Sequence, residues 1–222
     1  MFPEAVIFDL DGTLIDNNAY HIEAWKAFYN KIGKPFSLED YTKNINGRIN
    51  RDIFNYVFNT TLNPEKIEEY SDEKEAMYRD LYQAHIKPIN GLINFLEELE
   101  KAKIPKAIAT SGLVPNINFM FEHVPIKNHF FSVIDSTQVI YGKPHPEIFL
   151  KASISVNAVP SKCVAFEDSI AGIKSAKAAG MKVVGLTTTH TAEDISDADL
   201  IIKDYTEISL TKLRELAGLV NR

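Results

Sequence analysis

The feature that most constrains the fold is a regular alternation of short apolar runs with helical segments in the second half of the chain. After Pro88 the apolar, β-rich runs lie at residues 107–110, 130–134, 164–166, 183–186 and 200–202. The segments between and around them carry apolar residues at three- and four-residue spacing, which predicts helices at 91–102, 114–122, 145–155, 170–179 and 208–219. Strands separated by helices of this length form a parallel sheet with helices on both faces. We therefore expect a doubly wound α/β fold.

The first part of the chain has a different texture. The apolar run at 5–8 predicts one more buried strand, but no convincing strand follows between about residues 16 and 86. Helices are predicted there at 20–32, 50–58 and 64–86, the last with Asn63 as its N-cap. We expect an α/β core domain made of residues 1–15 and 88–222, with an α-helical cap domain, residues 16–87, inserted between them.

Composition narrows the functional classes. A hydrophobic fraction of 45% and a charged fraction of 24% are typical of a globular protein, and no run of eighteen apolar residues predicts a membrane span. The net charge is −6 with Lys and Arg scattered, which argues against a nucleic-acid partner. The single cysteine, Cys163, and the absence of a signal-peptide pattern favour a cytoplasmic location. The acidic run from Glu65 to Glu75 reads as a solvated helix face, and no pattern indicates the oligomeric state.

Polar residues follow several of the predicted strands. They form the segments Asp9-Leu10-Asp11, Thr110-Ser111-Gly112, Tyr141-Gly142-Lys143-Pro144 and Glu167-Asp168. In a parallel sheet, ligands bind beyond the carboxyl ends of the strands. Together the four segments supply carboxylates, a hydroxyl group with small neighbours, and one lysine. This combination indicates a site for phosphate and a metal ion.

The carboxylates of Asp9 and Asp11 are the most informative pair. Two carboxylates two residues apart, just beyond an apolar run, repel each other unless a cation or a proton lies between them. A hard divalent ion such as Mg²⁺, held by carboxylates and a substrate phosphate, removes that repulsion. Gly12 allows the chain to turn sharply after them. Taken alone, the segment is also compatible with a pair of carboxylates that only caps a turn.

The segment Asp9-Leu10-Asp11-Gly12-Thr13 resembles the first motif of the haloacid dehalogenase-like superfamily, whose phosphotransferases carry Asp-x-Asp-Gly-Thr after the first strand. The other segments resemble the remaining motifs of that superfamily in the same order, with Thr110, Lys143 and the pair Glu167-Asp168 at the motif positions. The resemblance covers essentially the whole chain. It implies a Rossmann-like core with an inserted helical cap.

The resemblance also implies a mechanism. Asp9 would attack phosphorus and become an aspartyl-phosphate, which splits one difficult displacement into two easier ones. Asp11 would protonate the leaving oxygen and later deprotonate the incoming water or hydroxyl. Mg²⁺ would be held by Asp9, the backbone carbonyl of Asp11 and Asp168, with Glu167 as a direct or water-mediated ligand.

Two further core motifs would handle the phosphoryl group. Thr110 and the backbone amides of Ser111 and Gly112 would hold its oxygens. Lys143 would offset the charges of the carboxylates and the phosphate together. The expected substrate is a small phosphorylated metabolite, above all a sugar phosphate.

The helical insertion points to a subfamily. The segments Asp16 to His21 and Ala24-Trp25-Lys26 resemble β-phosphoglucomutase and its phosphatase relatives, which carry a helical cap at this place. The segment Asn46-Gly47-Arg48 resembles the glycine-containing substrate loop of the same group. His21 is therefore expected near the active site, and Gly47 and Arg48 near the substrate. A surface salt bridge would explain Arg48 equally well.

Other readings of the motifs remain open. The dehalogenases of the superfamily lack the second aspartate, so Asp11 argues against that branch. A mutase agrees with His21, Trp25 and Lys74, but Asn50 stands where the mutase loop carries an arginine. Leu113 or Val114 likewise stands where the mutase has a lysine. We therefore favour a phosphatase, with a β-phosphoglucomutase-type phosphotransferase as the alternative and a non-catalytic binding module as the second alternative.

Overall fold

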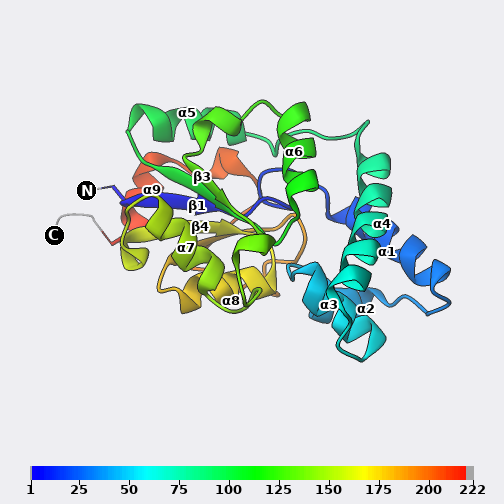
Figure 1. The fold of residues 1–222 in the computed structure, drawn as a ribbon. Helices are drawn as coiled ribbons and strands as arrows, with labels where there is room; N and C mark the ends of the chain where they lie inside the picture. The colour runs from blue at the N-terminus through cyan, green and yellow to red at the C-terminus, as the bar shows by residue number, and fades with distance from the viewer. Residues whose placement is uncertain (1, 219–222) are drawn as a thin grey trace.

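A single parallel sheet organises the molecule. The computed structural model describes residues 2–218, and in that part of the chain six strands run parallel in the order β3-β2-β1-β4-β5-β6 (Figure 1). Their bounds are β1 Ala5–Phe8, β2 Lys106–Ala109, β3 Ser132–Ile134, β4 Cys163–Glu167, β5 Lys182–Leu186 and β6 Leu200–Ile202. The chain builds the sheet outward from β1 on one side and then crosses to β4 to build the other side. The point where the order reverses therefore lies between β1 and β4, as the doubly wound prediction requires.

Helices cover both faces of this sheet. α5 (Leu92–Lys101), α6 (Val114–His123) and α9 (Leu210–Leu216) contribute side chains to the apolar cluster on one face. α7 (Glu147–Ser155) and α8 (Ile170–Ala178) contribute to the cluster on the other face. In Figure 1, α5 lies above the strands, and α7 and α8 lie below them. A sheet buried in this way needs strands that are apolar throughout, which explains their continuous apolar runs.

β1 shows how one strand supplies both clusters. Val6 and Phe8 belong to the first cluster, and Ala5 and Ile7 belong to the second, because successive side chains point to opposite faces. Phe8 stacks on Phe166 of β4 with ring centroids 5.0 Å apart. This packing fixes the end of β1 beside the end of β4.

The inserted segment forms a separate helical lobe beside the carboxyl ends of the strands (Figure 1). It contains α1 (Asn18–Lys31), α2 (Leu38–Asp40), α3 (Asn50–Phe58), α4 (Pro64–Tyr82) and a π-helical turn at Tyr41–Ile45. An apolar cluster of its own surrounds Phe28 and Phe54. The chain enters and leaves the lobe side by side, with a bridge between Ile15 and Pro88.

Most of the predicted elements are present, with differences at their ends. The helix predicted at 64–86 ends at Tyr82, because the chain turns there and returns to pair Pro88 with Ile15. The helix predicted at 145–155 begins at Glu147, after Pro146. The helix predicted at 208–219 spans Leu210–Leu216, and residue 219 lies outside the described residues. The sequence analysis missed α2 and the π-helical turn.

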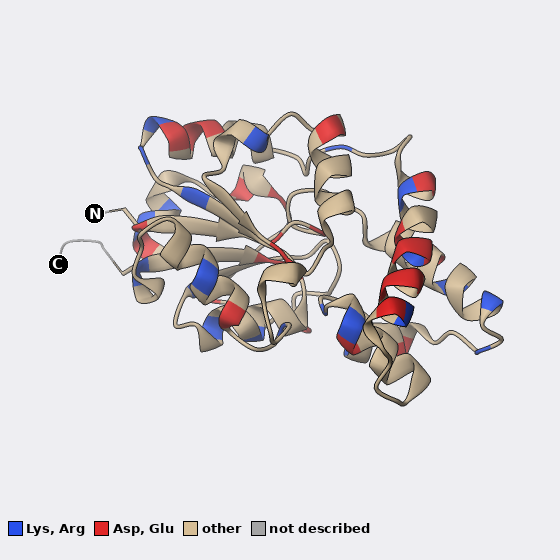
Figure 2. Ribbon diagram, viewed as in Figure 1, with Lys and Arg blue, Asp and Glu red and all other residues tan. Residues whose placement is uncertain are grey.

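The surface adds two observations. Within the described residues, no helix combines the length and the apolar character that a bilayer crossing requires. Lys and Arg are spread over both lobes in Figure 2, whereas Asp and Glu also gather where the strand ends face the helical lobe. The acidic residues at the strand ends are therefore the charge feature to explain.

We expect the Phe166→Ala substitution to lower the free energy of unfolding by about 3–5 kcal/mol, because it removes a fully buried ring from the centre of the sheet. Chemical denaturation followed by circular dichroism would measure this change. Phe131→Ala is the matched control, because that ring is 74% exposed and its loss should change stability by less than about 0.5 kcal/mol. Equal effects of the two substitutions would contradict this description of the core.

Candidate active site

The strand topology brings three carboxyl groups together at the point where the strand order reverses. Asp9 follows β1, Glu167 ends β4 and Asp168 follows it. The Asp9 amide donates to the carbonyl of Phe166 at 2.9 Å, which holds the two strand ends together. One carboxylate oxygen from each acidic residue lies within 4.8 Å of the other two, and all three residues are buried. Three of the four predicted metal residues, Asp9, Glu167 and Asp168, therefore form one cluster, which does not include the fourth, Asp11.

Burial and mutual repulsion make Asp9 and Asp168 resist ionisation. Burial raises the pKa of Asp9 to about 8, and the charges of Glu167 and Asp11 act in the same direction against the opposing effect of Lys143. Burial, with the charges of Glu167 and Asp9, also raises the pKa of Asp168 well above its usual range. A cation bound at this cluster would therefore stabilise the ionised forms of its carboxyl groups.

Lys143 supplies part of that charge. Its ammonium nitrogen lies 2.6 Å from Asp9 Oδ1 and 2.5 Å from Glu167 Oε1, and the side chain is buried. Burial opposes the charged form, but the two carboxylates raise the pKa of Lys143 above its ordinary value. One lysine faces three acidic groups, so a negative excess remains when all three are ionised.

Glu167 has a different environment from the two aspartates. Its Oε2 accepts hydrogen bonds from the amides of Asp168 and Ser169 at 2.9 and 2.8 Å and from the Ser169 hydroxyl at 2.9 Å. Its Oε1 faces Lys143. These contacts tie Glu167 to Lys143 and to the start of α8.

A divalent cation fits the donor set of this cluster. Carboxylate oxygens are the ligands that hard cations such as Mg²⁺ prefer. Gly12 has a φ of +72°, and a β-carbon at this position would collide with the Asp168 carboxylate. Glycine is thus required here for two reasons, backbone conformation and close approach to Asp168.

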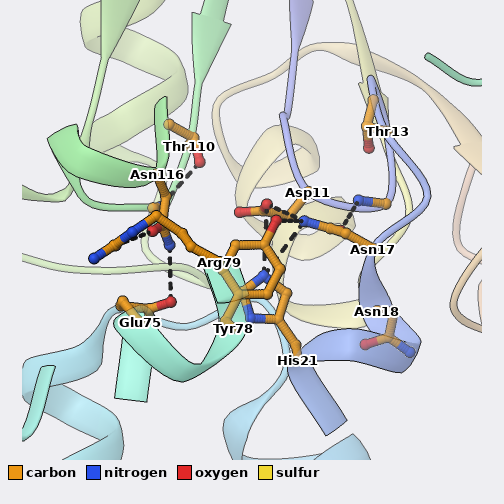
Figure 3. Close-up of polar contacts among 12 residues, drawn as sticks. Asp11, Thr13, Asn17, Asn18, His21, Glu75, Tyr78, Arg79, Thr110 and Asn116 are labelled. Carbon is orange, nitrogen blue, oxygen red and sulfur yellow. Dashed lines mark hydrogen bonds and ion pairs between the residues drawn. The ribbon is translucent and has the colours of Figure 1, made fainter. Parts of the chain in front are cut away.

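Asp11 belongs to a second group, formed with the start of the helical lobe (Figure 3). The Asn17 amide nitrogen donates to Asp11 Oδ1 at 2.5 Å, and Asn17 Oδ1 accepts from the Gly12 amide at 3.0 Å. Burial acts to raise the pKa of Asp11, but hydrogen bonds from His21 and Asn17 outweigh it and lower that pKa. Asn17, which the sequence analysis passed over, therefore fixes the position of Asp11.

His21 lies where the sequence predicted, beside the active site. Its Nε2 is 3.6 Å from Asp11 Oδ1, and its ring stacks on Tyr78 at 3.8 Å between centroids. The Lys74 ammonium lies 3.0 Å from His21 Nδ1. An ammonium can only donate, so Nδ1 accepts and the Nε2 hydrogen faces Asp11. Lys74 thus sets the orientation of His21 from the far side of the ring.

The segment after β2 faces the same space. The Thr110 hydroxyl accepts from the Gly112 amide at 2.9 Å, and the Ser111 hydroxyl donates to the carbonyl of Gly47 at 2.8 Å. Gly47 has a φ of +76°, and a β-carbon there would collide with the Ser169 side chain. A glycine therefore lets the loop of the helical lobe approach the sheet closely over the site.

One cavity connects these groups. Its lining includes Asp9, Asp11, His21, Gly47, Arg48, Ser111, Gly112 and Asp168 from the predicted site residues. Arg48 Nε is buried and has no partner among the described residues. The predicted Thr110 and Lys143 are buried directly behind this lining.

The same cavity also contains part of the run from Glu65 to Glu75, which the sequence analysis expected to form a solvated helix face. Lys74 and Glu75 are 2% and 5% exposed, so the expected solvated helix face does not extend to them. The buried positions of α4 are Ser71, Lys74, Glu75, Tyr78 and Tyr82. Their spacing of three and four residues is the helical signal that the charges concealed.

Comparisons with known proteins agree with this geometry. The sequence model described as haloacid dehalogenase-like hydrolase matches residues 6–186. Validoxylamine A 7'-phosphate phosphatase from Streptomyces hygroscopicus subsp. limoneus is 30% identical, with 92% of this chain and 95% of that protein covered. The β-phosphoglucomutase of Bacillus subtilis is 32% identical, with 96% and 94% covered.

A solved structure gives the same result for the fold. The crystal structure of a HAD hydrolase, family IA, variant 3, from Entamoeba histolytica has a TM-score of 0.85 and 33% identity. The alignment covers 96% of this chain and 99% of that one.

We expect a divalent cation to raise the melting temperature, because it would bind the folded acidic cluster and not the unfolded chain. A concentration about 100 times the dissociation constant stabilises by about 2.7 kcal/mol, which corresponds to several degrees for a chain of this size. Differential scanning fluorimetry with MgCl₂, against NaCl at equal ionic strength, would measure the shift. Asp168→Asn should reduce it strongly, while Asp72→Asn, an exposed change, should leave it intact. An equal shift in both variants would place the cation elsewhere.

Proposed function

We propose that this chain, which belongs to the haloacid dehalogenase-like hydrolase family, is a Mg²⁺-dependent phosphatase of small phosphorylated metabolites, above all sugar phosphates. Its relatives are phosphatases and a phosphomutase, so it is an enzyme of this group. The observation that carries the proposal is the buried carboxylate of Asp9 beside Lys143, with Asp168 and Asp11 at the same cavity. This is the arrangement that an aspartate nucleophile for phosphoryl transfer needs.

In the first step, Asp9 attacks phosphorus, and the bond between phosphorus and the leaving oxygen breaks. The product is an aspartyl-phosphate and an alcohol. Lys143 contacts Asp9 Oδ1 at 2.6 Å, so it orients the carboxylate and leaves the second oxygen for the attack. Bound Mg²⁺ would supply positive charge near Asp9 and Asp168, where the phosphate charge accumulates.

Asp11 would act first as a general acid and then as a general base. It would donate a proton to the leaving oxygen in the first step and remove a proton from water in the second, when water releases phosphate from Asp9. The contact with Asn17 at 2.5 Å holds its carboxyl group at the cavity. Because Asn17 lies at the start of the helical lobe, the position of Asp11 depends on how that lobe is docked.

The phosphoryl oxygens would lie against the segment after β2. Thr110 and the amides of Ser111 and Gly112 are the groups at hand there, and the Gly112 amide would exchange its contact with Thr110 for a phosphoryl oxygen. Binding would thus replace an internal hydrogen bond with one to the substrate.

We also propose that residues 16–87 act as a cap that opens for substrate and closes for chemistry. The two crossing segments, Leu14–Asp16 and Lys87–Asn90, would serve as hinges, and closure would expel water from the cavity. Three contacts of the closed arrangement support this. Ser111 bonds the carbonyl of Gly47, His190 lies 3.1 Å from Asn46 Oδ1, and Arg51 donates to the carbonyl of Ile140 at 2.6 Å.

A phosphomutase is the second candidate, favoured by the contact between His21 and Lys74 and by the similarity to β-phosphoglucomutase. A mutase needs a second phosphate site in the cap. The position expected to carry its arginine holds Asn50, whose amide is 3.0 Å from the Glu75 carboxylate. That environment suits a phosphatase better.

The test of the proposed function is phosphate release from a panel of small esters that includes glucose phosphates. We expect Mg²⁺-dependent release that falls by more than about 1,000-fold in Asp9→Asn, since the nucleophile is lost. Asp72→Asn, at an exposed position of α4, is the control and should retain full activity. Conversion of β-glucose 1-phosphate to glucose 6-phosphate with little free phosphate would establish the mutase instead. Absence of turnover would favour a binding module.

Replacing Asn17 tests the positioning of Asp11. We expect Asn17→Ala to lower kcat by about 10- to 100-fold with a smaller change in KM, because a displaced acid–base group slows chemistry more than binding. Asn18→Ala is the matched control, since Asn18 contacts the Tyr41 hydroxyl and not Asp11. Steady-state kinetics on the best ester would decide the point, and equal loss in both variants would argue for a general effect on the lobe.

A further inference from the structure

The loop that follows β5 has no role in the phosphoryl chemistry described so far. It begins with three consecutive threonines and a histidine, residues 187–190. Because β5 pairs in parallel with β4, this loop leaves the sheet beside the acidic residues at the end of β4. Three of its side chains, Thr188, Thr189 and His190, each approach a different part of the candidate active site.

The first half of the loop is held by the core. The Thr187 amide donates to the carbonyl of Ile202 in β6 at 3.1 Å. The Thr188 hydroxyl donates to the carbonyl of Gly12 at 2.5 Å. Gly12 is the residue that turns the chain between Asp11 and the helical lobe, so the loop is tied directly to the segment that carries the two aspartates.

The second half of the loop is held by the helical lobe. The His190 ring is buried, and its Nε2 lies 3.1 Å from Asn46 Oδ1. Because an amide oxygen can only accept, His190 Nε2 carries the hydrogen of this bond. Thr189 therefore lies between two anchors, one in the core and one in the lobe.

Thr189 lies beside the Asp168 carboxylate. A β-carbon on Gly12 would lie 2.0 Å from Asp168 Oδ2 and 2.9 Å from Thr189 Oγ1, so both oxygens border the same small space. The Thr189 hydroxyl oxygen is buried and has no fully formed hydrogen bond among the described residues. Burial and the neighbouring carboxylates raise the pKa of Asp168, and the Thr189 hydroxyl is close enough to oppose them. Thr189 thus presents an uncommitted hydroxyl to this carboxylate.

Asp168 is held less firmly than the other two members of the acidic cluster. Lys143 contacts Asp9 at 2.6 Å and Glu167 at 2.5 Å. In the described part of the chain, the one side-chain hydrogen bond to Asp168 is a long contact of 3.5 Å from the Thr13 hydroxyl to Oδ1. The affinity of a metal site depends on the hydrogen-bond partners that orient its ligands. A second hydroxyl at Asp168 is therefore placed where it would matter most.

We infer that Thr189 is a positioning residue for the divalent cation: its hydroxyl orients the Asp168 carboxylate and thereby strengthens cation binding at the acidic cluster. The inference rests on the cation site of the proposed function and adds a residue from outside the four polar segments that the sequence indicated. Because His190 ties the same loop to Asn46, the position of Thr189 also depends on the docking of the helical lobe.

The test measures the affinity for Mg²⁺ and not turnover. MgCl₂ is titrated into the metal-free enzyme at constant ionic strength, and isothermal titration calorimetry gives the dissociation constant. Thr189→Val keeps the branched shape of the side chain and removes the hydroxyl. We expect it to raise the dissociation constant by about 10- to 100-fold, as the loss of a partner that orients a metal ligand does. Thr189→Ser keeps the hydroxyl and should retain most of the wild-type affinity.

Thr187→Val is the matched control. It makes the same exchange two residues earlier in the loop, at a side chain whose hydroxyl has no hydrogen bond to another described residue. This variant should bind Mg²⁺ as the wild type does. The melting temperature of the metal-free Thr189→Val protein should change little, because the substitution lies outside the apolar clusters.

Three results would overturn the inference. One is wild-type affinity in Thr189→Val, and another is an equal loss in Thr189→Val and Thr187→Val. The third is a Thr189→Ser protein that binds Mg²⁺ as weakly as the valine variant, because the hydroxyl would then not be the cause. Mg²⁺-dependent phosphate release by the wild type, together with any of these, would leave the proposed function standing and remove only the inference. A wild-type enzyme that binds no Mg²⁺ would contradict both.

Discussion

The structure depends on the repulsion among buried carboxylates at the end of β1 and β4. Parallel pairing places Asp9 next to Glu167 and Asp168, and the aromatic packing of Phe8 on Phe166 fixes that neighbourhood from below. Lys143 offsets part of the charge, while burial and the neighbouring carboxylates still raise the pKa of Asp9. A chain with no use for a cation would gain stability by replacing these groups with apolar ones. This electrostatic cost therefore indicates a functional site. The apolar packing on both sides of the sheet supplies the stability that offsets the cost.

The helical lobe completes a site that the sheet only begins. The core around the sheet supplies the proposed nucleophile Asp9, Lys143 and the acidic cluster. Asp11, the proposed acid–base residue, is different, because Asn17 at the entrance of the lobe holds it. Gly47 then brings the lobe's loop against Ser111 on the other side of the cavity. Two separate contacts thus couple the docking of the lobe to groups that, in the proposed function, would touch the reacting phosphate.

The sequence predicted the parts of the site that are local in the chain. Asp9 and Asp11 stand two residues apart after one strand, and strand alternation was enough to expect Asp168 at the same edge. The prediction that the helix continues beyond Tyr82 was wrong. The chain turns back there to pair Pro88 with Ile15, and the spacing of apolar residues along a helix gives no sign of such a tertiary contact. The domain boundaries and the roles of the site residues stay predictions, since geometry places these residues together without showing what each does.

Glu75 shows why the other residues of the cavity could not be predicted from the sequence. In the sequence it belongs to an acidic stretch of α4, and charge alone makes such a residue look solvated. Its burial requires an ammonium from the preceding residue, an amide from Asn50 on α3 and another from Asn116 on α6, three partners that the chain separates by up to 41 residues. The residues on the opposite wall of the cavity, Asn50, Glu75 and Asn116, are brought together by tertiary contacts that no local sequence pattern predicts.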